Sequence, residues 1–133
     1  MAAKKQKPKK CISKKEAKEL HDNWCNQREG HLKKRLGFED TREFWWSVEE
    51  LEEYLAYVKS ESNKQGIDHP GIRIYMGAYS KAKCKMKRGY STLFMVPTGA
   101  PAKSLGKENA EQPNNYDIDA YNRGGSGRPP HIY

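Results

Sequence analysis

The amino-acid sequence predicts an α+β fold in which two helices pack on a small antiparallel sheet. The first observation is a pair of serine capping boxes, 13–16 and 47–50, each followed by apolar residues at helical spacing. The second is an alternation of apolar and polar residues over 71–79, and the third is the apolar run from Tyr90 to Val96. A helical pair with a hairpin laid across it is the alternative that these patterns leave open.

The first predicted helix covers residues 14–35. Ser13 supplies its cap, and Gly37 supplies the stop. The apolar spacing within it is broken around residues 27–30, which indicates a bend at Gly30.

The second predicted helix covers residues 48–64 and ends at Gly66. It follows the aromatic stretch 41–46, which suits a short strand or an extended lead-in. Ser47 begins its capping box, and Trp46 and Leu51 occupy the hydrophobic-staple positions on either side of that cap.

The predicted sheet consists of strands at 71–79 and 90–96. The second strand is apolar on both faces, which favours a central position, and Pro97 is expected to end it. Between the strands, residues 81–87 alternate strictly between lysine and small or apolar residues, as in an extended hairpin ribbon or a wide loop.

The composition limits how much of the chain can form one core. Hydrophobic residues make up 35% of the 133 residues, against about 45–50% in typical domains. We therefore expect a disordered basic arm over residues 1–11, a single α+β domain over 12–98, and a flexible tail over 99–133 that carries aromatic anchors.

Hydropathy and cysteine content predict a cytoplasmic protein. No apolar run approaches the roughly 20 residues of a membrane span, and no apolar segment follows the basic N-terminus as in a secretory signal. Three cysteines are too few, and odd in number, for a disulfide scaffold.

The net charge of +8 combines blocks of opposite sign. Residues 1–36 carry +8, residues 37–70 carry −6, residues 71–99 carry +6 and residues 100–133 are neutral. Segregated charge of this kind points to a polyanion or an acidic partner on one side of the protein.

The motifs that carry catalysis or bind cofactors are absent, so we expect neither an enzyme nor a cofactor. The serine in the glycine-rich stretch 124–127 is followed by Arg128 where a nucleophile elbow needs glycine. His21 and Cys25 share one helical face but lack a third ligand, so no metal site is expected.

With catalytic motifs and metal sites not expected, the remaining candidate for function is a binding surface. Aromatic residues on a strand beside a lysine-rich ribbon suit nucleic acid, because rings stack on bases and lysines displace counterions. The residues predicted to bind nucleic acid are Lys33, Lys34, Arg35, Arg73, Tyr75, Tyr79, Lys81, Lys83, Lys85, Lys87 and Arg88.

The C-terminal segment carries more hydrophobic residues than a solvating tail needs. We expect it to be mobile alone and to become ordered against a protein partner or a second copy of the chain. The residues predicted to bind that partner are Tyr116, Ile118, Tyr121, Ile132 and Tyr133.

Two stretches are similar to a group of small uncharacterised bacterial proteins. These are the IRIYMGAY stretch at 72–79 and the TLFMVPT stretch at 92–98, and a glycine- and proline-rich end follows them. The resemblance covers residues 44–130. It implies a bacterial cytosolic protein and implies no activity.

Together these observations predict a small non-enzymatic binding module that recognises nucleic acid, DNA or RNA, through the basic arm and the Lys-rich ribbon. The alternative is a protein-interaction or assembly component that uses the C-terminal tail and the acidic helix face at 49–53. In that case an acidic face and a basic ribbon on one chain could also pair between copies.

Overall fold

The computed structural model describes residues 6–81, 89–101 and 112–126, and confirms the α+β class. The described residues divide into two units, one over residues 6–40 and one over residues 41–126. Neither unit coincides with the single domain expected over 12–98. A boundary follows Asp40, and the second unit continues beyond residue 98.

The first unit contains one long helical stretch made of α1 (Lys14–Trp24), the π-helical segment η1 (Cys25–Glu29) and α2 (Gly30–Leu36). The Ser13 hydroxyl accepts a hydrogen bond from the Glu16 N–H at 3.1 Å, and Gly37 ends the helix in the left-handed conformation. The predicted helix and both of its ends are confirmed.

The break in apolar spacing around residues 27–30 corresponds to η1 rather than to a glycine bend. A π-helical turn holds more residues than an α-helical turn, so it shifts the following side chains around the helix axis. Gly30 itself has ordinary helical dihedral angles. None of the residues in these three segments is buried.

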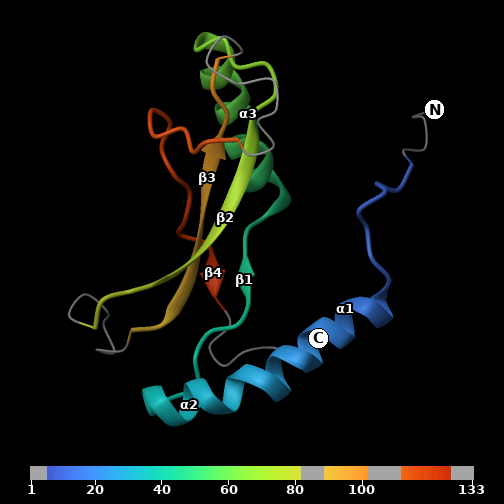
Figure 1. The fold of residues 1–133 in the computed structure, drawn as a ribbon, viewed down its shortest axis with the longest axis vertical. Coiled ribbons are helices and arrows are strands. Elements are labelled where there is room, and N and C mark those ends of the chain that lie inside the picture. The colour runs from blue at the N-terminus through green and yellow to red at the C-terminus, as the bar shows by residue number, and fades with distance from the viewer. Residues whose placement is uncertain (1–5, 82–88, 102–111, 127–133) are drawn as a thin grey trace. The chain divides into compact units, whose positions relative to one another are not determined.

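The second unit contains α3 (Val48–Lys64), the antiparallel pair β2 (Gly71–Ala78) and β3 (Ser91–Thr98), and the short antiparallel pair β1 (Phe44–Trp45) and β4 (Gly125–Ser126). The two long strands run beside α3 (Figure 1). The helix predicted at 48–64 and the strand predicted at 71–79 are confirmed, whereas the stretch 41–46, expected as a short strand or an extended lead-in, is extended with only Phe44–Trp45 paired as a strand.

β3 is the central strand of the second unit, as its two apolar faces predict. On one side it pairs with β2 in a register from Gly71 opposite Thr98 to Ala78 opposite Ser91. On the other side the C-terminal segment forms two isolated bridges, Met95 with Tyr121 and Thr98 with Asn114.

Pro97 does not end this strand, contrary to the sequence prediction. The pairing continues through it to Thr98, and the Asn115 N–H donates to the Pro97 carbonyl at 2.9 Å on the other edge. The proline ring is fully buried.

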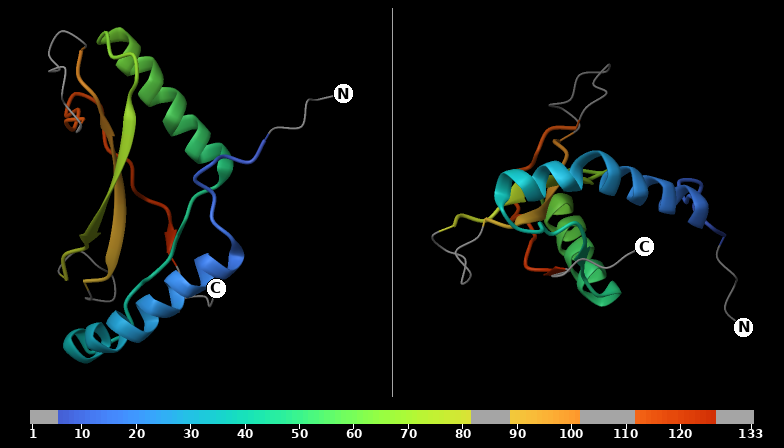
Figure 2. Two further views of the ribbon diagram at one scale, coloured as in Figure 1. Left: turned by 45° about the vertical axis from the view of Figure 1, so that its right-hand side comes forward. Right: turned by 90° about the horizontal axis from the view of Figure 1, so that it is seen from below.

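The core of the second unit joins three parts of the chain. Tyr54 and Val58 come from α3, Met95 comes from β3, and Ile118 comes from the C-terminal segment. Partly buried side chains that pack against this cluster are Trp46, Leu51, Ile72 and Tyr121. In the left view of Figure 2, α3 lies on one side of the β2–β3 sheet, as these contacts require.

The expectation of a flexible tail from residue 99 is wrong for the described residues 112–126. Only 4% of the Ile118 surface is exposed, and the Asn115 side-chain amide donates to the Gln65 side-chain oxygen at 2.7 Å. This segment packs because it supplies both apolar area for the core and backbone partners for the free edge of β3.

Replacing Ser47 with alanine should lower the free energy of unfolding by about 1 kcal/mol. Both bonds of the predicted capping box are present: the Glu50 N–H donates to the Ser47 hydroxyl at 2.9 Å, and the Ser47 N–H donates to the Glu50 carboxylate at 3.1 Å. Urea unfolding measures the change, with Ser60→Ala on the exposed side of α3 as control. Equal stability of the two variants would contradict the cap.

Candidate nucleic-acid interface

The alternation along β2 separates two kinds of side chain onto the two faces of the sheet. Ile72 lies opposite Pro97 and Ile74 opposite Met95, so these residues share one face, on which Ile72 and Met95 pack with α3 while Ile74 is 59% exposed. The other face therefore carries Arg73, Tyr75 and Gly77 from β2, together with their β3 partners Val96, Phe94 and Thr92.

Two tyrosine rings are accessible on this second face. The exposed fraction is 37% for Tyr75 and 41% for Tyr79. The Tyr75 ring stacks on Phe94 with a centroid separation of 5.3 Å and an interplanar angle of 13°. Phe94 thus supports one side of the Tyr75 ring.

Gly77 lies between the two tyrosines on this face. A Cβ atom placed there would come within 3.4 Å of the Phe94 ring and of the Thr92 methyl group. Tyr79 follows directly after β2, and the strand rise of about 3.3 Å per residue places its backbone about 13 Å from that of Tyr75. The glycine keeps the surface between them low, so each tyrosine can take a separate base.

Two asparagines from the C-terminal segment fix the polar ends of these tyrosines. The Asn114 amide donates to the Tyr75 hydroxyl at 2.9 Å, and the Tyr79 hydroxyl donates to the Asn122 side-chain oxygen at 2.9 Å. Asn122 also donates to the Thr92 hydroxyl at 3.0 Å and to the Leu93 carbonyl. The rings are therefore held in place before any ligand arrives.

Arg73 is positioned by the same segment. Its guanidinium donates to the Asn114 side-chain oxygen, and to the Gln112 carbonyl at 2.8 Å. Because a guanidinium carries five N–H donors, these two bonds use one donor on each terminal nitrogen of Arg73.

The structure brings together three of the predicted nucleic-acid-binding residues, Arg73, Tyr75 and Tyr79, and leaves Lys81 exposed beyond the end of β2. Lys33, Lys34 and Arg35 are exposed in the last turn of α2, which belongs to the first unit. The other predicted residues of the ribbon lie outside the described residues: Lys83, Lys85, Lys87 and Arg88.

The partner-binding predictions are wrong for two residues. Ile118 belongs to the core, and Tyr121 stacks on Tyr54 with centroids 4.4 Å apart, so both side chains are used within the unit itself. Tyr116 is 89% exposed, and its role stays a prediction. Ile132 and Tyr133 lie outside the described residues.

Sequence reasoning missed Gln112, Asn114 and Asn122. Their roles depend on the bridges from Thr98 to Asn114 and from Met95 to Tyr121, which no local pattern in the sequence predicts. The density of asparagines at 114, 115 and 122 was the available signal, since such residues satisfy backbone and hydroxyl groups where regular pairing ends.

The Cys25 Sγ and His21 Nε2 atoms lie 3.7 Å apart on one helical face, as their spacing predicts. Within the described ranges, no group of three or more His, Cys, Asp or Glu residues could hold a metal ion. The described helices include none with the length and apolar content that crossing a membrane requires.

Comparison of the chain with protein-family models, with curated proteins and with solved structures found no match.

Proposed function

We propose that the face of β2–β3 that points away from α3 binds single-stranded nucleic acid, with bases stacked on Tyr75 and Tyr79. One observation carries this proposal: two accessible tyrosine rings stand on a sheet face, one backed by Phe94 and both fixed at their hydroxyls by amides. Stacking on such rings is tolerant of sequence, because every base has a π-face.

The charge of the surrounding sequence supports the proposal. Residues 71–99 contain six Lys or Arg residues and no Asp or Glu. Arg73 lies on the same face as the two tyrosines, and Lys81 follows directly after them. Cations at these positions would contact phosphates while the rings stack on bases, which is the usual division of work in single-strand binding.

The alternative of a protein-interaction component has less support. Ile118 and Tyr121, two of its five predicted anchors, are used inside the second unit. The acidic side of α3 remains exposed, with Glu49, Glu52 and Glu53.

Replacing Tyr75 or Tyr79 with alanine should each weaken binding of a labelled mixed oligonucleotide pool about 5- to 150-fold. The expected loss follows from the roughly 1–3 kcal/mol that stacking on one aromatic ring contributes. Fluorescence anisotropy at low salt measures it. Tyr116→Ala, which removes an 89% exposed tyrosine that lies outside the β2–β3 pair, is the matched control and should bind like the natural chain.

The salt dependence tests the lysine ribbon in the same assay. Replacing Lys81, Lys83, Lys85 and Lys87 with glutamine should reduce the slope of log K against log salt by up to about 3, since each lost contact with a single strand removes about 0.7. An unchanged slope would assign these lysines to protection of the sheet edge. Absence of binding by the natural chain at low salt would overturn the proposed function.

A further inference from the structure

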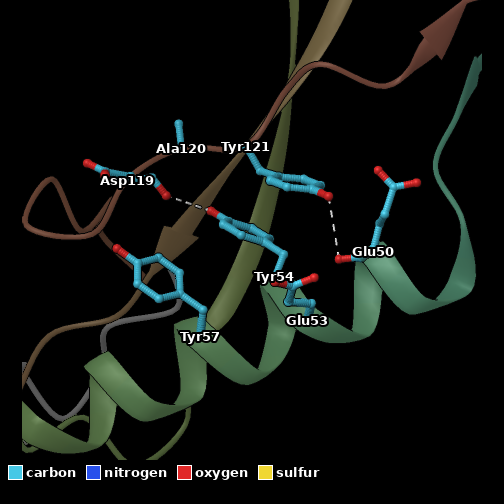
Figure 3. Close-up of a pocket in the computed structure, with 7 residues that line it drawn as sticks. All are labelled: Glu50, Glu53, Tyr54, Tyr57, Asp119, Ala120 and Tyr121. Carbon is cyan, nitrogen blue, oxygen red and sulfur yellow. Dashed lines mark hydrogen bonds between the residues drawn. The ribbon is translucent and has the colours of Figure 1, made fainter.

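A cavity of about 410 Å³ lies between α3 and the C-terminal segment, away from the Tyr75 face. Four of its residues belong to α3 at positions 50, 53, 54 and 57, a spacing that places them along one side of the helix. The opposite wall comes from residues 119–121 (Figure 3). The residues that line the cavity are Glu50, Glu53, Tyr54, Tyr57, Asp119, Ala120 and Tyr121.

Three tyrosine rings form the apolar part of this cavity. Tyr54 stacks on Tyr121 at 4.4 Å and lies 6.2 Å from Tyr57 at an angle of 38°. The Tyr54 hydroxyl donates to the Asp119 carbonyl at 2.9 Å, and the Tyr121 hydroxyl donates to the Glu50 carbonyl at 3.5 Å. These bonds fix Tyr54 and Tyr121, while Tyr57 remains 40% exposed at the side of the cavity.

The charged groups of the cavity wall are all carboxylates. One oxygen of Glu50 is used by the Ser47 N–H, whereas Glu53 lies exposed one turn further along α3. Burial raises the pKa of the Tyr121 hydroxyl, and Glu50 and Glu53 raise it further because negative charge disfavours the phenolate. Burial also raises the pKa of Tyr54 to about 12. Tyr54 and Tyr121 therefore keep neutral hydroxyls at physiological pH beside these carboxylates.

We infer that this cavity binds the ammonium group of a lysine side chain presented by a basic peptide segment. The faces of tyrosine rings attract cations, and carboxylates at the rim add direct ionic attraction. A phosphate would be repelled by the same carboxylates. This cavity thus differs from the proposed nucleic-acid surface in its charge and in its position. The inference does not rest on the proposed function.

Charge complementarity within the sequence identifies the kind of segment. Residues 37–70, which contain most of the cavity wall, carry −6, whereas the stretch Ala2–Lys10 carries five lysines and no acid. The lysine-rich segment of a second copy of the chain therefore matches the cavity in charge.

The test uses a fluorescent synthetic peptide with the sequence of residues 2–10, titrated into the full chain and followed by anisotropy. Tyr57→Leu and Glu53→Gln should each weaken binding about two- to fivefold, and the double variant about tenfold. Tyr57→Phe keeps the ring, and Glu52→Gln removes a neighbouring carboxylate that does not line the cavity. Both of these controls should bind like the natural chain.

Competition from the chain's own lysines is removed by repeating the titration with Lys4, Lys5, Lys7, Lys9 and Lys10 replaced by glutamine. The proposal is overturned if the peptide does not bind this chain, or if Glu52→Gln weakens binding as much as Glu53→Gln. It is also overturned if a peptide with glutamine in place of every lysine binds equally well. Unfolding curves of the Tyr57 variants confirm that each is folded, and oligonucleotide binding should be unchanged in Tyr57→Leu.

Discussion

A chain that ends after Thr98 should fail to fold its second unit. Truncation there removes Ile118 from the core and Tyr121 from its stack on Tyr54. Removing a buried aliphatic side chain costs about 2–5 kcal/mol and an aromatic one about 3–5 kcal/mol, so the two losses together rival the 5–15 kcal/mol that stabilises a typical domain. The edge of β3 also loses both of its bridges.

Circular dichroism melting and a two-dimensional amide spectrum measure this loss in the truncated chain. In the full chain, Ile118→Ala should lower the free energy of unfolding by about 2–5 kcal/mol. Tyr116→Ala, two residues away but 89% exposed, should change it by less than about 0.5 kcal/mol. A truncated chain that melts cooperatively at the temperature of the full chain would restore the flexible tail that the sequence predicts.

Replacing Trp46 with alanine should lower the free energy of unfolding by about 3–5 kcal/mol. The Trp46 ring packs against the core and against Tyr121, with ring centroids 6.1 Å apart, and its indole N–H donates to the Asn122 carbonyl at 3.0 Å. The neighbouring Trp45 is 66% exposed, so Trp45→Ala should cost less than about 1 kcal/mol. Urea unfolding of both variants measures the difference.

Gly124 packs closely against Trp46 and the backbone of Trp45. A Cβ atom there would overlap the Trp46 ring at Cε2 and would lie 2.7 Å from the Trp45 carbonyl oxygen, so Gly124→Ala forces the ring or the backbone to move. We expect a loss of about 1–3 kcal/mol. A Trp46 variant as stable as the Trp45 variant would show that the indole contributes little to the fold.

Local signals were sufficient to predict most of the elements. The Ser13 and Ser47 caps, the Gly37 stop and the alternation in β2 each depend on residues a few positions apart, and all are present. The pairing of β2 with β3 followed from the order of the two strands along the chain. The division after Asp40 has no such local signal, since the apolar side of the first helix predicts packing whereas Leu20 is 63% exposed.

The candidate surface was predicted only for the residues whose position depends on local alternation along a strand. Alternation alone placed Arg73 and Tyr75 on one face and allowed Phe94 to lie near them. Tyr90, the aromatic residue directly before β3, is only 4% exposed and so is not part of this surface. The asparagines that fix the tyrosines come from a segment without periodicity, whose position is set by the free edge of β3 and by the space beside Tyr54.

The bridges on the outer edge of β3 also set the order of events as the chain is synthesised. The β2–β3 pair is complete once Thr98 has left the ribosome, but its outer edge and the core gain their last members only with Ile118 and Tyr121. Until then the nascent chain presents an unpaired strand edge and a half-built core, the features that make folding intermediates prone to aggregate. Completion of the core of the second unit is therefore a late event that depends on contacts distant in sequence. Slower translation across residues 99–121 prolongs the time during which the edge of β3 is unpaired and the core incomplete.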